Sequence, residues 1–212
     1  MCFAVFTIFF GASMAVKEQH WKRRLAYSTV ANLSYILFGV TMMTQAGLTA
    51  ALLHMAFHAE IKILAFFCAG AVLHSTGREY LNQLGGLGRK MPITFGCFTV
   101  SALALTGIPP LSGFVSKWHL LTAAADSLNP LAYAGAAVLL FGALLTAIYM
   151  FTAVCKAFFP AADSVDEKLE NEREVNWRMT VPMVVLAAGI LLTGIYAQPI
   201  VNAAMAIAQG LR

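Results

Sequence analysis

Charged side chains are scarce in this sequence. Only 11% of its 212 residues are Asp, Glu, Lys or Arg, whereas 59% are hydrophobic; a soluble domain carries about 25% charged residues. One aqueous core cannot hide so many apolar side chains, so lipid must cover many of them. The sequence therefore predicts an all-α integral protein of the cell membrane, with one membrane domain over residues 1–212. A net charge of +4, scattered along the chain, does not indicate a nucleic-acid partner.

Motifs for cofactor chemistry are missing as well. The sequence holds no CxxC pair, no nucleotide-binding loop and no flavin fingerprint. Its cysteines stand singly in apolar runs, where we expect small buried side chains and neither a disulfide nor a metal site. These are Cys2, Cys68, Cys97 and Cys155. We expect no cofactor, so any redox chemistry linked to this chain must take place on other subunits.

Long apolar runs are present instead. A spanning helix needs about 20 mostly apolar residues. Six runs are candidates: Met1–Val16, Leu25–Ala46, Leu48–Ser75, Pro92–Ala125, Leu131–Phe159 and Met179–Ile207. No charged segment precedes the first run, so we interpret it as a short or truncated spanning helix rather than a signal peptide. We accordingly expect that the chain does not begin at the start of a complete domain.

Basic residues occupy alternate connections between these runs. They occur in Lys17–Arg24, in Arg78–Lys90 and around Pro160–Arg178, whereas the turns near Gln45 and Asp126 have none. Cytoplasmic loops of membrane proteins carry an excess of Lys and Arg, so we expect these three connections to be cytoplasmic. Six crossings then leave both termini outside, and Pro160–Arg178 is expected to be a solvated polar loop.

The third run carries ionisable residues where they are costly. His54, His58 and Lys62 are spaced i, i+4 and i+8, which places them on one stripe of a helix. An ionised side chain at the bilayer centre costs about 2.5–3.5 kcal/mol, so such groups are functional candidates by default. Histidine titrates near neutral pH, and a lysine kept from water releases its proton more readily. The stripe is therefore a candidate proton path through intervening water.

Two other interpretations of this stripe are weaker. The histidines could be packing groups bonded to neighbouring carbonyls, but a lysine on the same stripe argues against a purely structural role. Metal ligation by His54 and His58 is disfavoured because no Cys or carboxylate accompanies them at ligand spacing. Glu60 lies about 200° around the helix from His58 and Lys62. We expect it to be protonated, or paired with a basic group on another helix or subunit.

The fourth run contains Gly107, Pro109, Pro110 and Gly113 just before Lys117. The prolines remove backbone donors and clash with the preceding turn, so a helix break is expected. Inside a membrane a break is tolerated where protein or a water-filled cavity satisfies the freed groups. Transporters place ion sites at such broken helices, so Lys117 is a second proton-transfer candidate. A kinked structural helix with an interfacial lysine is the alternative.

Further polar residues are accessory candidates. The cluster Lys22–Arg24 most simply anchors the cytoplasmic interface, although Lys22 could also deliver protons. His119 is expected near an interface. The second run contains polar side chains that could hold water or join helices: Tyr27, Ser28, Asn32 and Ser34.

Four segments together resemble the antiporter-like subunits of respiratory complex I, a family that includes large Mrp-type sodium/proton antiporter subunits and membrane-bound hydrogenase subunits. Trp21–Thr29 resembles the family's lysine–arginine and Leu-Ala-Tyr-Ser motif, and His54–Lys62 its histidine–lysine helix. Gly85–Pro92 resembles its loop, and Gly107–Lys117 its broken helix. Their order and spacing match over nearly the whole chain, so the combination is specific although each motif alone is modest.

The resemblance implies a subunit of fourteen helices built from two inverted five-helix repeats and flanking helices. This chain matches only the second repeat and the final helices. By resemblance Lys62 is the central relay lysine, with His54 and His58 as its partners. Lys117 corresponds to the charged residue of the distal broken helix, where some members carry glutamate. Glu60 departs from the usual apolar residue.

We therefore predict a proton-translocating membrane subunit, or a fragment of one, in a redox-driven complex of the NADH:quinone oxidoreductase or membrane-bound hydrogenase type. Its expected partners are other membrane subunits, the lipid bilayer and protons or sodium ions. A subunit of an Mrp-type sodium/proton antiporter and a truncated, non-transporting membrane scaffold are the alternatives. Neighbouring genes would separate the first two, and extension of the reading frame upstream would test the third.

Overall fold

The computed structural model describes residues 1–159 and 172–210, and every regular element in these ranges is a helix. The α-helices are α1 (Cys2–Lys17), α2 (Trp21–Thr41), α3 (Gln45–Thr76), α4 (Leu87–Lys90), α5 (Pro92–Thr106), α6 (Ser112–Asp126), α7 (Pro130–Phe158), α8 (Trp177–Ile195) and α9 (Gln198–Gly210). A 3-10 helix, η1 (Leu81–Gln83), precedes α4.

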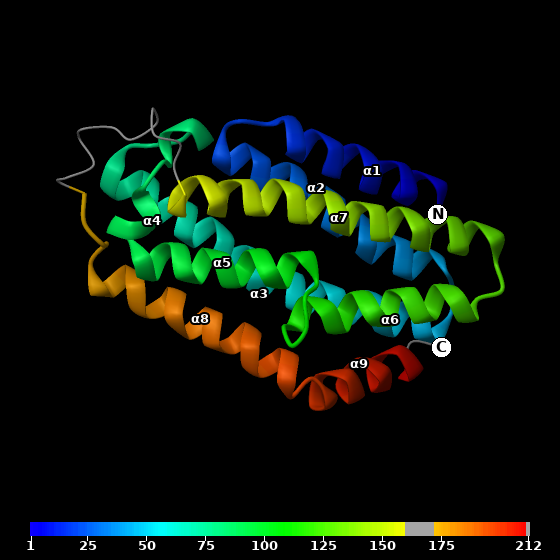
Figure 1. Cartoon of the computed structure of the whole chain (residues 1–212). Helices are drawn as coiled ribbons and strands as arrows, with labels where there is room; N and C mark the ends of the chain where they lie inside the picture. Colours follow the sequence, from blue (N-terminus) through cyan, green and yellow to red (C-terminus); the bar gives the residue numbers. More distant parts are fainter. Residues whose placement is uncertain (160–171, 211–212) are drawn as a thin grey trace.

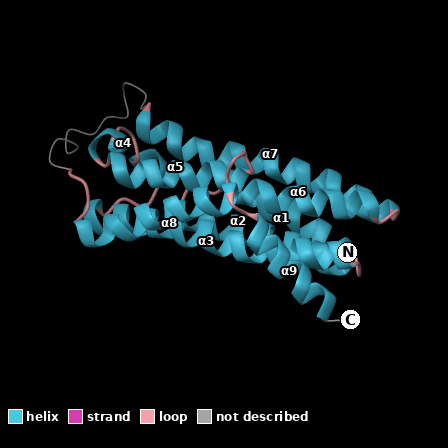
Figure 2. Cartoon of the chain, turned by 90° about the horizontal axis from the view of Figure 1, so that it is seen from below, coloured by secondary structure: helices cyan, strands magenta, loops and turns pink. Residues whose placement is uncertain are grey.

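Helix α3 is the centre of the bundle. It packs against α2, α5, α6, α8 and α9, whereas α7 packs against α1, α5 and α6. Helices α8 and α9 run along the edge of the bundle opposite α1 (Figure 1). The start of α1 and the end of α9 lie at the same end of the bundle in both views (Figure 1, Figure 2). The α1–α2 turn, α4 and the end of α7 lie at the other end.

Two of the basic connections lie at the end of the bundle with the α1–α2 turn and α4, which we call the basic end. Its segments are joined by backbone hydrogen bonds, in which Trp21 N donates to the Glu79 carbonyl at 2.9 Å and Leu81 N to the Gln19 carbonyl at 3.0 Å. Arg24 differs from an interfacial anchor because its side chain is only 3% exposed. Its guanidinium donates to the carbonyls of Val16, Glu18 and Tyr149 at 2.8–3.0 Å, which fixes α1, α2 and α7 to one another.

Among the described helices, three are long and apolar enough to cross a membrane individually, namely α3, α7 and α8. Helices α1 and α5 are apolar but shorter. A helix of 15 residues, such as α5 or α6, is about 22 Å long at 1.5 Å per residue, less than the ~30 Å of a bilayer's hydrocarbon core. Of the residues of α8, only Met183 and Ile190 are buried, so its surface is an apolar one suited to lipid.

The sixth apolar run is not the single helix predicted over Met179–Ile207. Helix α8 ends at Ile195 and α9 begins at Gln198. Pro199 explains the interruption because it lacks an N–H group and its ring would clash with the carbonyl four residues earlier, that of Ile195. The fourth run likewise forms two helices, and its interruption lies at the paired prolines.

Two smaller expectations also differ from the structure. The polar loop predicted to end at Arg178 ends earlier, because α8 begins at Trp177 with the Asn176 side chain accepting from Arg178 N; residues 160–171 of that loop lie outside the described residues. Cys2 and Cys155 are exposed, whereas Cys68 and Cys97 are buried as expected. A cysteine in an apolar run can face outward because the lipid-facing side of a spanning helix is apolar as well.

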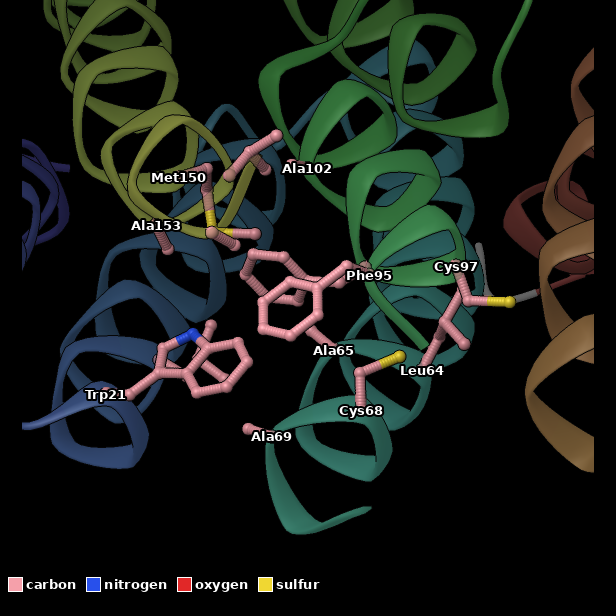
Figure 3. Packing of buried hydrophobic residues seen from close by; sticks show 14 of the residues in the cluster. Trp21, Leu64, Ala65, Cys68, Ala69, Phe95, Cys97, Ala102, Met150 and Ala153 are labelled. Atoms are coloured by element: carbon pink, nitrogen blue, oxygen red, sulfur yellow. The ribbon is translucent and has the colours of Figure 1, made fainter. Parts of the chain in front are cut away.

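The larger hydrophobic cluster lies towards the basic end, between α2, α3, α5 and α7 (Figure 3). Trp21 stacks on Phe95 with ring centroids 5.8 Å apart and meets Phe98 edge-on at 5.0 Å. Met150 from α7 and Leu64 from α3 belong to the same cluster. Stacked and edge-to-face aromatic pairs contribute about 0.5–1.5 kcal/mol beyond their buried area, so Trp21 joins α2 to α5 at the level where α2 begins.

Glu174 caps the N-terminus of α5 from the segment that precedes α8. Its Oε2 accepts from Ile93 N at 2.8 Å and Thr94 N at 3.3 Å, and its Oε1 accepts from Thr94 Oγ1 at 2.5 Å. The first N–H groups of a helix have no partner within it, and a carboxylate there also complements the helix dipole. This side chain therefore ties the connection before α8 to the start of α5.

We expect Glu174→Ala to destabilise the chain by about 0.5–2 kcal/mol, the usual cost of removing an N-terminal cap. Thermal unfolding of the detergent-solubilised protein, followed by its helical circular dichroism, measures the change. Arg173→Ala is the matched control, because Arg173 is the exposed neighbour. Equal melting temperatures for the two variants would contradict the capping role.

Candidate proton-transfer site

The predicted stripe on α3 is buried along its length. His54, His58 and Lys62 are 3%, 6% and 6% exposed. The imidazole rings of His54 and His58 lie face to face, with centroids 5.8 Å apart and planes inclined by 18°. The helical spacing thus brings the three side chains together inside the bundle.

Helix α2 presents a matching polar face to this stripe. The Lys62 ammonium donates to the Leu25 carbonyl at 3.0 Å and to the Ser28 hydroxyl. At the other end of the stripe the Tyr35 ring meets the His54 ring edge-on, with centroids 5.4 Å apart. Sequence reasoning identified Ser28 as polar but missed Tyr35. The residue spacing could have identified Tyr35, because Ser28, Asn32 and Tyr35 are spaced i, i+4 and i+7 on one face of α2.

No carboxylate of the described residues forms an ion pair with Lys62. Two neutral oxygen atoms and the face of Phe66, whose ring centroid is 5.9 Å from Nζ, surround the ammonium instead. Backbone and hydroxyl dipoles can hold a cation, but they do not neutralise it. The Lys62 proton can therefore leave without breaking an ion pair.

The second lysine lies at the interruption between α5 and α6. Gly107, with φ +94°, ends α5 in the left-handed conformation that favours glycine, and α6 begins at Ser112. Lys117 is 5% exposed, and its ammonium donates to the carbonyls of Leu105 at 2.5 Å and Thr106 at 3.0 Å. These are the last carbonyls of α5, which have no partner within the helix and form its negative end. The break therefore supplies the ligands of Lys117.

Ser116 and Tyr35 connect the stripe on α3 to Lys117. The His54 Nδ1 and Ser116 Oγ atoms are 3.0 Å apart, and the Lys117 Nζ atom lies 5.7 Å from the centroid of the Tyr35 ring that also contacts His54. We call the resulting series the buried polar line. It consists of Lys62, His58, His54, Tyr35, Ser116 and Lys117.

Several buried polar atoms beside this line have no hydrogen-bond partner among the described residues. They are Asn32 Oδ1, His54 Nε2, His58 Nε2 and Ser112 Oγ. A buried donor or acceptor left without a partner costs about 1–3 kcal/mol, so each needs an explanation such as bridging water or a transient partner. Both unpaired histidine nitrogens belong to the stripe, and Asn32 lies on the facing side of α2.

The accessory candidates lie away from the line. Lys22 is half-buried at the basic end, where it lines a small pocket with Trp21 and Arg78. His119 lies towards the opposite end, with Nδ1 2.8 Å from the Val115 carbonyl oxygen, and it lines a cavity of about 390 Å³ together with Gln45 and Asp126. Glu60 lies on another face of α3, and its carboxylate Oε2 contacts Thr193 Oγ1 of α8 at 3.3 Å.

The family model described as NADH:quinone oxidoreductase/Mrp antiporter, TM, matches residues 1–146. The chain is 34% identical over 204 residues to NADH-quinone oxidoreductase subunit N of Desulforudis audaxviator, covering 92% of this chain and 40% of that protein. It is also 34% identical over 205 residues to a Na(+)/H(+) antiporter subunit of Alkalihalophilus pseudofirmus, covering 95% and 40%.

A solved structure shares the fold. The structure of the Mrp complex from Dietzia sp. DQ12-45-1b contains a chain that superposes with a TM-score of 0.85 at 26% identity, covering 97% of this chain and 45% of that one. The present chain thus spans about two fifths of the length of these relatives.

The break between α5 and α6 depends on two glycines. A Cβ atom at Gly113 would overlap the Ala104 carbonyl oxygen, and a Cβ at Gly107 would lie 3.0 Å from Lys117 Cδ. We expect Gly113→Ala to cost about 1–3 kcal/mol through overpacking, and Gly107→Ala about 1–2 kcal/mol through its left-handed backbone.

Gly96→Ala in α5 is the matched control, because a Cβ there meets no atom within 4 Å. In a helix interior alanine is more stable than glycine by up to about 1 kcal/mol, so this variant should melt no lower than the parent protein. Thermal melting in detergent measures all three variants. Equal stability of Gly113→Ala and Gly96→Ala would show that α5 and α6 do not pack as described.

Proposed function

The chain belongs to the NADH:quinone oxidoreductase/Mrp antiporter transmembrane family, and on that premise we propose that it is the proton-conducting, C-terminal portion of an antiporter-like membrane subunit. The parent complex in this proposal is a redox-driven one of the NADH:quinone oxidoreductase type, and its other membrane subunits are the partners. One observation carries the proposal. Two buried lysines, neither ion-paired to a carboxylate of the described residues, are joined by two histidines, a tyrosine and a serine.

In the proposed mechanism Lys62 and Lys117 are the two ends of a proton path. A proton that leaves the Lys62 ammonium is taken up by a water molecule or by a nitrogen of His58, and it is passed through water to a ring nitrogen of His54. His54 delivers it through Ser116 Oγ and water towards the Lys117 amine. Water bound at Asn32 Oδ1 and at the free histidine nitrogens would bridge the gaps between these groups.

Lys117 is positioned for reversible protonation by the end of α5. Its ligands, the Leu105 and Thr106 carbonyls, attract the ammonium because they form the negative end of helix α5. A proton arriving at the amine is therefore stabilised without a carboxylate that would hold it permanently. Loss of that proton leaves two carbonyl oxygens that can accept hydrogen bonds from water.

The membrane topology is part of the proposal. Helix pairs α5–α6 and α8–α9 would each make one crossing, and with α1, α2, α3 and α7 they give six. The basic end would face the cytoplasm, because Lys and Arg are enriched in cytoplasmic loops, and both termini would lie outside. The connection between α7 and α8 would be cytoplasmic, within a single membrane domain over residues 1–212.

Membership of an Mrp-type sodium/proton antiporter is the second candidate. It is favoured by the 34% identity to the Alkalihalophilus pseudofirmus antiporter protein and by the similarity to a chain of an Mrp complex. The buried polar line has the same relay role in both candidates, which differ in the parent complex and in whether sodium is exchanged.

We expect Lys62→Ala to abolish proton pumping, because alanine can neither accept nor release a proton. Lys62→Arg should fail as well, since arginine remains protonated throughout. The assay is proton pumping in vesicles that carry the assembled complex, with the abundance of this chain checked by immunoblotting. Arg23→Lys, an exposed cation-for-cation exchange outside the buried polar line, is the matched control and should pump normally.

The arginine variant separates a titrating lysine from a structural one. A structural cation would tolerate arginine in its place, whereas a proton carrier would not. Full pumping by a normally assembled Lys62→Arg complex would show that Lys62 has a structural role only.

We also expect cysteines placed at Asn82 and Asp126, in a protein without its native cysteines, to react from opposite sides of the membrane. Asn82 lies in η1 at the basic end, and Asp126 ends α6 at the other end. A membrane-impermeant thiol reagent applied to right-side-out cells and to inverted vesicles provides the measurement. Labelling of both positions from the same side would rule out the six-crossing topology.

A further inference from the structure

Glu60 is the one acidic side chain of this sequence that falls in the middle of an apolar run. Of the other nine Asp and Glu residues, those that the structure describes lie in connections or at helix ends. Glu60 is 15 residues from the start of α3 at Gln45 and 16 from its end at Thr76, which places it about 22–24 Å from either end of the helix. A carboxylate this far from both helix ends needs a counter-ion or a proton.

The partner surface of Glu60 is the last part of α8. Its Oε2 lies 3.3 Å from Thr193 Oγ1, and a Cβ atom at Gly189 would overlap its Oε1. The absence of a side chain at Gly189 therefore leaves space for the Glu60 carboxyl group. Gly189 lies one helical turn before Thr193, whose hydroxyl contacts the same carboxyl group. The carboxyl group of Glu60 lies against one defined turn of α8.

The Thr193 hydroxyl offers Glu60 a hydrogen bond in either protonation state. It lies 3.3 Å from Glu60 Oε2 and 2.8 Å from the Gly189 carbonyl oxygen. It can donate to the carboxylate, or it can donate to Gly189 and accept from the protonated carboxyl group. One neutral hydroxyl does not balance the charge of a carboxylate, so the deprotonated form of Glu60 still needs a counter-ion.

No basic group of the described residues forms an ion pair that would serve as this counter-ion. Helix α8 contributes Arg178 alone, at its opposite end, and α9 contributes no titratable residue. Tyr196, between these helices, is 70% exposed. On α3 itself, His58 and Lys62 face the buried polar line on another side of the helix. No ion pair of Glu60 is formed with any of these groups.

The same part of α8 touches the break that holds Lys117. A Cβ atom at Gly194 would overlap the backbone of Pro110, Leu111 and Ser112. The end of α8 therefore packs against the break at the paired prolines, whose α5 side binds Lys117, and Glu60 contacts the neighbouring Thr193 of the same helix. A change of charge at Glu60 would act on the α8 turn that supports this break.

We propose that Glu60 is a second ion-binding site of the chain, a carboxyl group that binds and releases a proton between α3 and the end of α8. The site is separate from the buried polar line and does not require Lys62. Its ligand is the proton itself, bound by Glu60 and shared with the Thr193 hydroxyl.

A hydrophobic carbodiimide tests this directly, because it reacts with protonated carboxyl groups inside membranes. The carboxyl proton moves to one nitrogen of the reagent while the carboxyl oxygen bonds to its central carbon, and the adduct rearranges to a stable N-acylurea. Dicyclohexylcarbodiimide is applied to membranes carrying the full-length protein in its complex. Peptide mass spectrometry then quantifies the label at Glu60 and, as internal controls, at Glu79 and Glu174.

We expect Glu60 to be labelled at neutral pH and the label to disappear at alkaline pH, while Glu79 and Glu174 remain unlabelled. Glu60→Gln should lose the label, and Glu60→Asp should retain it at position 60. An unlabelled Glu60 at every pH in a normally assembled complex would overturn the proposal. Protection by sodium chloride but not by choline chloride would also overturn it, because the occupant would then be a sodium ion.

Carbodiimide labelling of Glu60 is measured independently of proton pumping. If Lys62→Arg pumps normally and Glu60 is labelled, the relay mechanism fails while this site stands. If pumping requires Lys62 and Glu60 is never labelled, the relay mechanism stands while the proposed site at Glu60 fails.

Discussion

The bond between the Lys62 ammonium and the start of α2 is the interaction on which the buried polar line depends. It joins the central helix α3 to the Leu25 carbonyl and the Ser28 hydroxyl. Desolvation of a charged group costs several kcal/mol even after relaxation, so a buried ammonium without a carboxylate needs well-placed dipoles. Those dipoles come from α2, whose start is fixed by the guanidinium of Arg24 and by the stacking of Trp21. The core at the basic end thereby holds one end of the proposed proton path.

The other end of that path depends on interrupted helices. In an α-helix the Leu105 and Thr106 carbonyls would accept from the nitrogens of residues 109 and 110, but both are prolines and carry no N–H group. The two carbonyls bind the Lys117 ammonium instead, and the turn of α8 around Gly194 packs against the break. Prolines thus have a direct electrostatic consequence here, because they expose helix ends inside the bundle. Two such ends, α5 and α8, lie beside ionisable side chains.

Local spacing predicted the parts of this arrangement that belong to one helix. The i, i+4, i+8 pattern placed His54, His58 and Lys62 on one face, and the paired prolines located the interruption before Lys117. Contacts between distant segments were not predictable in this way: nothing near Glu60 in sequence points to Thr193, which follows it by 133 residues. The α8–α9 interruption was missed because Pro199 stands alone in an otherwise apolar run, and Arg24 because its three carbonyl acceptors are defined only by the packed bundle.

Proton transfer between Lys62 and Lys117 is best tested by a structure of the complete complex at a resolution that reveals ordered water. We expect ordered water between Asn32 Oδ1 and His58 Nε2, continuing past His54 towards Lys117. We also expect that no carboxylate from the rest of the complex is paired with the Lys62 ammonium. A dry contact in which apolar side chains or lipid fill the space between Lys62 and Lys117 would contradict proton transfer along this line.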